Sequence, residues 1–118
     1  RKGARFIGIN PYKNLPTDKG LIPGAGSFIS FFETATQEKA TIIGKPQSVI
    51  MDKALEQLQL KKDEVIMVGD NYETDIKAGI NNGIDTLLVL TGFTPASAVD
   101  SLPIQPTFVI NSLESWEF

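Results

Sequence analysis

The stretch "EVIMVGDNYETDIKAG", residues 64–79, decides the fold of this chain. An apolar run from Val65 to Val68 ends at Gly69, and polar side chains follow at once. A short apolar run closed by glycine is typical of a buried strand. Four side chains with carboxylate or amide oxygens then fall within six residues: Asp70, Asn71, Glu73 and Asp75. The stretch therefore predicts a strand over residues 65–69 with an acidic loop at its carboxyl end.

A helix is expected directly after this loop. Thr74 is a good N-cap, and Asp75 would lie in the first turn, where the helix dipole favours an anion. Ile76 and Ile80 mark the side of the helix that we expect to be buried, and Gly83 is suited to end it.

Strands and helices alternate over the remainder of the chain from residue 40 onward. Apolar runs predict strands at 40–44, 85–90 and 107–110, and a helical pattern fills 47–60. Strands that alternate with helices indicate a parallel sheet with helices on its faces. Ligands of such sheets bind beyond the carboxyl ends of the strands, where Asp70 and the pair Thr91-Gly92 are expected.

The first forty residues read differently. Residues 4–9 predict a short strand, and residues 10–20, rich in proline and asparagine, predict a loop. A turn at 23–27 would open a helix whose apolar side chains recur at helical spacing. We expect this stripe to pack in the core; its members are Phe28, Phe31, Phe32 and Ala35.

Composition excludes several classes of function. The chain has 118 residues, 42% of them hydrophobic, and suits one domain or a piece of a larger protein. Its net charge is −3, with no basic run, which argues against nucleic acid as a partner. No apolar run approaches the roughly 18 residues of a membrane span, and no signal-peptide pattern is present. Cysteine and histidine are absent, which excludes disulfides, thiolate or imidazole metal sites and histidine triads. The absence of cysteine and of targeting signals favours the cytoplasm.

The acidic loop is suited to bind a hard divalent cation. Mg²⁺ takes oxygen ligands, usually one or two carboxylates together with water and substrate phosphate. Asp70 could supply such a ligand, while Asp75 could accept hydrogen bonds from metal-bound water or orient a lysine. Lys45, between Gly44 and Pro46, is the natural candidate for that lysine. Its charge could neutralise a phosphate and a nearby carboxylate nucleophile.

Two other interpretations compete with this one. An aspartate at a strand end is often only a turn former or a helix cap. A receiver-like signalling domain also uses carboxylates, Mg²⁺ and a lysine on a parallel sheet. In such domains, however, the acidic pair comes early and the lysine last, whereas here Lys45 precedes Asp70.

Three motifs resemble those of the haloacid dehalogenase (HAD) superfamily of phosphatases. "GDNYETD" (69–75) matches its G-D-x-x-x-T-D acidic motif, and "IIGKP" (42–46) is similar to its lysine motif. "GARFIGINPYKNLPTDKGLIPGAGS" (3–27) resembles the end of the cap domain in the NagD-like branch, the p-nitrophenyl- and sugar-phosphate phosphatases. The resemblance covers essentially the whole chain. It implies an α/β fold: the C-terminal half of a HAD-like Rossmannoid parallel sheet (43–118), preceded by the end of an α/β cap (1–42).

The resemblance also implies a role for each matching residue. Asp70 would bind Mg²⁺ directly, and Asp75 would support the metal site or hold Lys45. Lys45 would bind the phosphoryl group, and Asn71 could contact a metal-bound water. Asn10 would lie in a cap loop that helps to choose the substrate. The branch usually has Thr-Asn-x-Asp where this chain has residues 9–12, so Tyr12 in place of the aspartate leaves the specificity open.

Two motifs of the superfamily are missing. One is the Ser or Thr at a strand end that holds the phosphate and precedes the lysine, since Thr91 ends a strand only after the acidic motif. The other is the nucleophile motif. The aspartate nucleophile of the superfamily lies in a D-x-D-G-T motif, and this chain contains no Asp-x-Asp. The resemblance thus implies Mg²⁺-dependent hydrolysis of small phosphomonoesters through an aspartyl-phosphate, with the nucleophile on a core segment upstream of this chain. Strand 65–69 would normally lie beside that segment, and its free edge would need another partner. The alternative is a non-catalytic half-domain that acts only by associating with a second chain; whether the protein is a homodimer is left open.

Overall fold

The computed structural model describes residues 3–116. The chain divides between Gly44 and Lys45 into two compact units, and each unit is described by itself. None of the helices within the described residues is long and apolar enough to cross a membrane.

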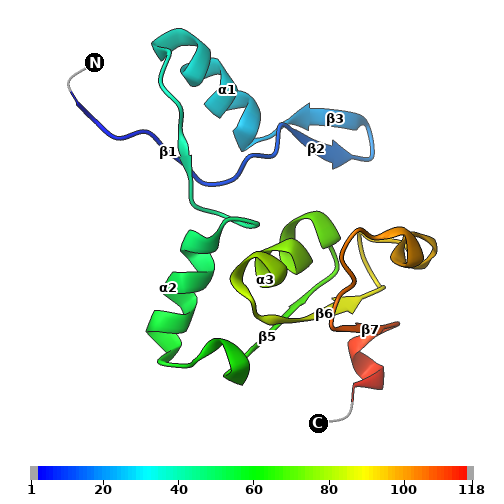
Figure 1. The fold of residues 1–118 in the computed structure, drawn as a ribbon. Coiled ribbons are helices and arrows are strands. Elements are labelled where there is room, and N and C mark those ends of the chain that lie inside the picture. The colour runs from blue at the N-terminus through cyan, green and yellow to red at the C-terminus, as the bar shows by residue number, and fades with distance from the viewer. Residues whose placement is uncertain (1–2, 117–118) are drawn as a thin grey trace. The chain divides into compact units, whose positions relative to one another are not determined.

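The first unit contains two small sheets and one helix (Figure 1). Strand β1 (Ile7–Gly8) pairs in parallel with β4 (Thr41–Ile42). Strands β2 (Asn14–Thr17) and β3 (Gly20–Pro23) form an antiparallel hairpin, and α1 (Ala25–Thr36) follows it. The predicted strand 40–44 therefore forms, but its partner is β1, and it does not extend the sheet of the second unit.

The hairpin corrects the expected loop at residues 10–20. Prolines and asparagine argued for irregular structure there, yet Pro16 lies in β2 opposite Leu21. A two-stranded ribbon consists only of edge strands, and edge strands tolerate proline because one side of each needs no amide donor. All residues of both strands are exposed, so the alternating burial that identifies a strand in a sequence is absent here.

The aromatic stripe of α1 forms as a helix but is not buried within the described residues. Phe28, Phe31 and Phe32 are 61%, 66% and 50% exposed. The rings of Phe31 and Phe32 meet edge to face, with their centroids 5.3 Å apart. The prediction of a core position was wrong for these side chains because helical spacing identifies an apolar face but not what covers it.

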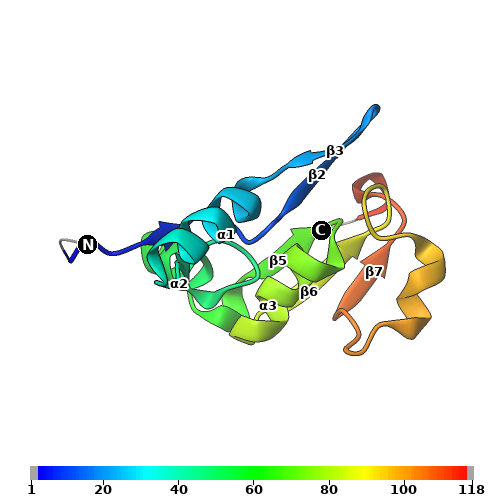
Figure 2. The same cartoon turned by 90° about the horizontal axis from the view of Figure 1, so that it is seen from above.

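The second unit is built on a parallel sheet of three strands in the order β5-β6-β7 (Figure 2). The strands are β5 (Ile66–Gly69), β6 (Asp85–Val89) and β7 (Phe108–Ile110). Helix α2 (Ser48–Leu58) precedes β5, and α3 (Lys77–Asn82) connects β5 to β6. Short 3₁₀ turns at Lys62–Glu64, Ala96–Ser101 and Leu113–Ser115 complete the unit. This arrangement confirms the predicted α/β class with a parallel sheet.

The core of this unit lies between β6 and the helix that follows β5. Leu87, Leu88 and Ile76 are at most 1% exposed. Gly79 allows α3 to approach the sheet closely, since a Cβ there would overlap the methyl group of Thr86. Gly83 ends α3 with a φ of 64°, as the sequence predicted.

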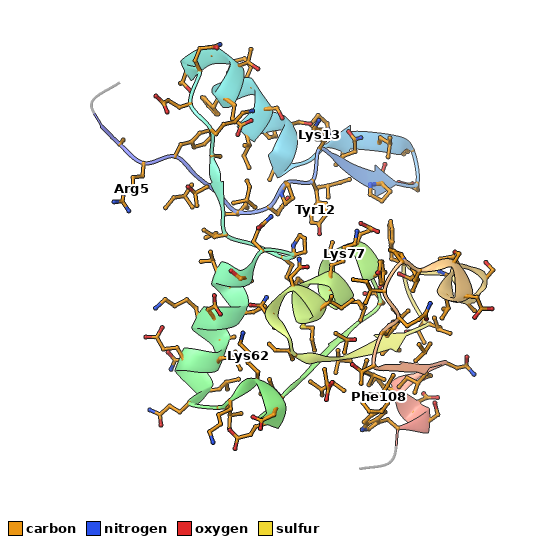
Figure 3. The ribbon with its side chains drawn as sticks, in the orientation of Figure 1. Arg5, Tyr12, Lys13, Lys62, Lys77 and Phe108 are labelled. Carbon is orange, nitrogen blue, oxygen red and sulfur yellow. The ribbon has the colours of Figure 1, made fainter. Side chains whose placement is uncertain are left out.

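Both edge strands of the sheet expose apolar side chains. On β5, Ile66 and Val68 are 37% and 40% exposed, and no strand of the described chain pairs with its outer side. Figure 3 labels Phe108 on β7. This side chain is 47% exposed, and its ring meets that of Trp116 edge to face, with the centroids 6.0 Å apart. The free edge expected for strand 65–69 is therefore present in this structure.

Candidate active site

Asp70 lies at the carboxyl end of strand β5, beside the loop that follows β6. The backbone N–H of Phe93 donates to Asp70 Oδ2 at 2.7 Å, and the N–H of Thr94 donates to the Asp70 carbonyl at 2.9 Å. A Cβ on Gly92 would overlap the Asp70 carboxylate, so only glycine allows the loop to approach this carboxylate so closely. The carboxylate is thus held by backbone groups that are distant in sequence.

The helical segment after Asp70 starts earlier than the sequence suggested. A π-helical turn spans Tyr72–Ile76 and leads into α3. Asn71 is its N-cap, with Oδ1 accepting from the N–H of Glu73 at 3.0 Å. Thr74, the predicted N-cap, lies inside the turn and is buried, so that prediction was wrong. Asparagine and threonine are both good caps, and the one nearer the strand end takes the position.

Asp75 is 7% exposed and receives three hydrogen bonds. Oδ1 accepts from Lys45 Nζ at 2.5 Å and from the Thr74 hydroxyl at 3.2 Å, while Oδ2 accepts from the N–H of Asn71 at 3.2 Å. Gly69 makes room for this side chain, because a Cβ there would overlap the Asp75 carboxylate. Buried polar side chains in proteins are nearly always hydrogen-bonded in this way.

Lys45 reaches Asp75 from the start of the second unit. Its peptide bond to Pro46 is cis, and the carbonyl of Pro46 accepts a hydrogen bond from Asn81 Nδ2 at 3.2 Å, which ties this segment to α3. The Lys45 side chain is 43% exposed. An ammonium has three donors, so one directed at Asp75 leaves others available to an anion.

Beside Asp70 lies a hollow of about 400 Å³ at the carboxyl ends of β5 and β6. Its walls include Val68, Val89, Gly92 and Leu113. A larger hollow of about 610 Å³ lies in the first unit, between Phe6 and Lys39, and its walls contain neither the lysine nor the acidic motif. Asp70 lines the smaller hollow, which is therefore the one of functional interest.

The donor set is compatible with Mg²⁺ only if the cation takes part of its ligands from elsewhere. No group of three or more acidic side chains that could hold a metal ion exists among residues 3–116. Both oxygens of Asp75 are committed to protein donors, and Asn71 Oδ1 is used in the helix cap. Asp70 Oδ1, by contrast, accepts no hydrogen bond from the described residues. One carboxylate with water and a phosphate suits Mg²⁺.

The structure brings Lys45, Asp70, Asn71 and Asp75 together within the second unit. Asn10 belongs to the first unit, where its Oδ1 accepts from the N–H of Tyr12 at 3.1 Å. Tyr12 is 36% exposed. The roles assigned to these residues remain predictions.

The sequence places Thr91-Gly92 at a strand end but gives no signal for Phe93 or Thr94, because their contacts to Asp70 are made by backbone N–H groups. Tyr72 was not predicted either; it is 3% exposed, and its hydroxyl donates to the carbonyl of Ile104 at 2.9 Å. Lys77 Nζ lies 5.6 Å from the centroid of that ring, and Figure 3 shows Lys77 at the start of α3.

Residues 42–116 match the family model described as HAD-hydrolase-like. The chain belongs to this family. The matched range contains the whole second unit as described, including Lys45, Asp70 and Asp75. The recognition of HAD motifs in the sequence is thereby confirmed.

Individual relatives place the chain in the NagD-like branch. It is 47% identical over 116 residues to 5'-nucleotidase YutF of Bacillus subtilis, covering 98% of this chain and 45% of that protein. It is 46% identical over 113 residues to an acid sugar phosphatase of Staphylococcus haemolyticus, covering 96% and 43%.

Solved structures of HAD phosphatases are also similar to this chain in fold and sequence. A thermostable NPPase double mutant from Geobacillus stearothermophilus is 49% identical with a TM-score of 0.86, and the match covers 98% of this chain and 45% of that one. NagD of Escherichia coli K-12 is 35% identical with a TM-score of 0.86, again over 98% and 45%. The chain thus spans slightly less than half the length of the proteins it matches.

Proposed function

We propose that the whole protein hydrolyses small phosphomonoesters in a Mg²⁺-dependent reaction through an aspartyl-phosphate. The observation that carries this proposal is the position of Asp75. One carboxylate oxygen binds the ammonium of Lys45 and the other binds the N–H of Asn71, the residue after Asp70. A cation suited to phosphate and a carboxylate suited to Mg²⁺ are thereby connected through one buried side chain.

Each candidate residue of this chain would have its own role in binding the metal or the phosphate. Asp70 would offer its free oxygen, Oδ1, to the metal, and Asn71 would contact a metal-bound water. Mg²⁺, when bound, would offset the negative charge of the substrate phosphate. Lys45 would bind the phosphoryl group, and Asp75 would hold the ammonium in place. A preorganised cation stabilises charge in the transition state better than a mobile one does.

The nucleophile is proposed to lie outside these 118 residues. No Asp-x-Asp is present in the sequence. The unpaired side of β5, with Ile66 and Val68 exposed, offers a place where a strand that carries the nucleophile could pair. Parallel neighbours end at the same edge of a sheet, so such a strand would bring its terminal residues close to Asp70.

The substrate class is proposed from the relatives. They are named a 5'-nucleotidase, an acid sugar phosphatase and an NPPase. A phosphate group on a small organic molecule is common to these names. The segment with Asn10 and Tyr12 would help to choose among such molecules.

Phosphate release by the whole protein tests this proposal. Rates should be measured with p-nitrophenyl phosphate, a nucleoside 5'-monophosphate and a hexose phosphate, first with Mg²⁺ and then after chelation. We expect turnover of at least one substrate, loss of turnover with chelator and recovery when Mg²⁺ is added back. Unchanged turnover in chelator would contradict the proposal.

A second function, association without catalysis, is favoured by the same free edge of β5. In this account the chain is a half-domain that acts by binding a partner chain. It predicts a defined complex with the segment that completes the sheet and no turnover by that complex. Turnover by the complex, or a folded chain that does not associate with the segment, would count against it.

A further inference from the structure

The loop that leaves β6 fixes the position of Asp70 through two backbone donors. Phe93 N–H binds the carboxylate at Oδ2, and Thr94 N–H binds the main-chain carbonyl of the same residue, at 2.7 and 2.9 Å. Side chain and backbone are therefore held together. With Oδ2 used in this way, the loop also sets the direction in which Oδ1 points.

Thr94 adds a third bond on the other side of Asn71. Its hydroxyl oxygen accepts from the N–H of Tyr72 at 2.8 Å, and the residue is 6% exposed. One buried threonine thus binds the chain both at Asp70 and at Tyr72, the residues that flank Asn71. Removal of the hydroxyl would leave the Tyr72 N–H buried without its acceptor, which proteins avoid.

Gly92 completes the contact by being small. A Cβ at this position would overlap Asp70 Oδ2. An alanine there would push the carboxylate away from its bond with Phe93 while leaving the hydroxyl of Thr94 in place.

We propose that Thr94 is a positioning residue for the metal-binding carboxylate of Asp70, acting through the Gly92–Thr94 loop. The proposal rests on the proposed function, because it assigns Asp70 to Mg²⁺. Groups that orient a metal ligand without touching the metal typically contribute about 10- to 100-fold to metal affinity. Thr94 is expected to act in this range.

The chain offers a matched control in Thr86. It is 2% exposed, and its hydroxyl oxygen accepts from the N–H of Thr107 at 3.0 Å. The chemical environment therefore resembles that of Thr94: a buried threonine whose oxygen binds a backbone N–H. Thr86 lies near the start of β6, however, whereas Thr94 follows its end. Thr→Val at either position removes the same bond with little change in volume.

The experiment is a calorimetric titration of the whole protein with Mg²⁺ alone, without substrate. We expect Thr94→Val to raise the dissociation constant for Mg²⁺ about 10- to 100-fold. Thr94→Ser, which keeps the hydroxyl, should remain close to wild type. Thr86→Val should lose thermal stability, as Thr94→Val does, yet bind Mg²⁺ like wild type.

Two results of this titration would count against the proposal. Equal Mg²⁺ affinity of Thr94→Val and wild type would overturn it, as would equal weakening by Thr86→Val. If Thr94→Val does not fold, Thr94→Ala and Thr94→Ser decide in the same assay: weakened binding by Thr94→Ala together with wild-type binding by Thr94→Ser supports the proposal, and unchanged binding by Thr94→Ala overturns it. Asp70→Asn distinguishes a failure of the proposed function from a failure of the role assigned to Thr94. If wild type and Asp70→Asn bind Mg²⁺ alike, the proposed function fails together with this inference; if only the Thr94 result is negative, the proposed function stands.

Discussion

Lys45 Nζ lies 2.5 Å from Asp75 Oδ1, although 30 residues separate them in the chain. The Asp75 side chain is 9% exposed and that of Lys45 is 43% exposed. The pair joins the segment before α2 to the helical turn after β5. It therefore links two parts of the second unit that are distant in the sequence, at the point where phosphate chemistry is proposed.

Lys45→Met is expected to lower the free energy of unfolding by about 1.5–3 kcal/mol, the range for a hydrogen bond to a charged group. The variant leaves the buried Asp75 carboxylate without its ammonium partner. Lys53→Met is the matched control, because Lys53 pairs with Glu56 on the exposed surface of α2. An exposed pair contributes about 1 kcal/mol or less. Urea unfolding measures both, and equal losses would show that the Lys45 pair has no special role in stability.

The first unit is expected to depend on pH through Glu33. The N–H of Ala40, at 2.9 Å, and the ammonium of Lys39, at 3.1 Å, hold the pKa of this carboxyl below its ordinary value. Because the pKa is lower in the folded state, the stabilisation is complete above the ordinary pKa of glutamate and is lost as the pH falls through the folded value.

Amide exchange at Ala40 reports this dependence locally. After correction for the intrinsic effect of pH on exchange, protection should fall as the carboxyl is protonated, and Glu33→Gln should remove that fall. Glu38→Gln, an exposed neighbour, serves as the control and should exchange like wild type. A pH profile for Glu33→Gln identical to that of wild type would refute the assignment.

Asn71→Ala is expected to destabilise the second unit by about 1 kcal/mol, because it removes the N-cap of the π-helical turn. Asn71→Ser should recover most of the loss, since serine is a comparable cap. Thermal unfolding measures both variants. A full loss in Asn71→Ser would indicate that the amide acts in some way other than capping.

The sequence predicted the second unit better than the first, for physical reasons. Residues 85–90 form a nearly continuous apolar run, and in the structure Leu87 and Leu88 are buried at the centre of the sheet. A strand that is buried in this way has a continuous run of apolar residues, which is visible in the sequence. The hairpin at 14–23 is exposed throughout and leaves no such pattern. Likewise, the spacing of Phe28 and Phe32 predicted a helix correctly but could not show that the described residues leave these side chains at least half exposed.

The candidate site was predicted in part. Lys45 and Asp75 could be expected to meet because Lys45 follows one strand of an alternating α/β pattern and Asp75 lies in the first helical turn after the next strand. The hydrogen bonds from Phe93 and Thr94 to Asp70 could not be predicted. Both bonds use backbone N–H groups, which every residue except proline has. Only the spatial arrangement distinguishes these N–H groups from the others.

Asp70 is proposed to bind the Mg²⁺ of a phosphatase. The most direct test of this role is the initial rate of phosphate release by the whole protein at a fixed Mg²⁺ concentration, with Asp70→Asn compared to Asp63→Asn. Asp63 lies on the exposed turn before β5 and controls for the loss of one negative charge. We expect Asp70→Asn to lower the rate at least about 100-fold, since groups that merely orient a ligand already contribute up to that factor. Asp63→Asn should match wild type. Full activity of Asp70→Asn would contradict the account.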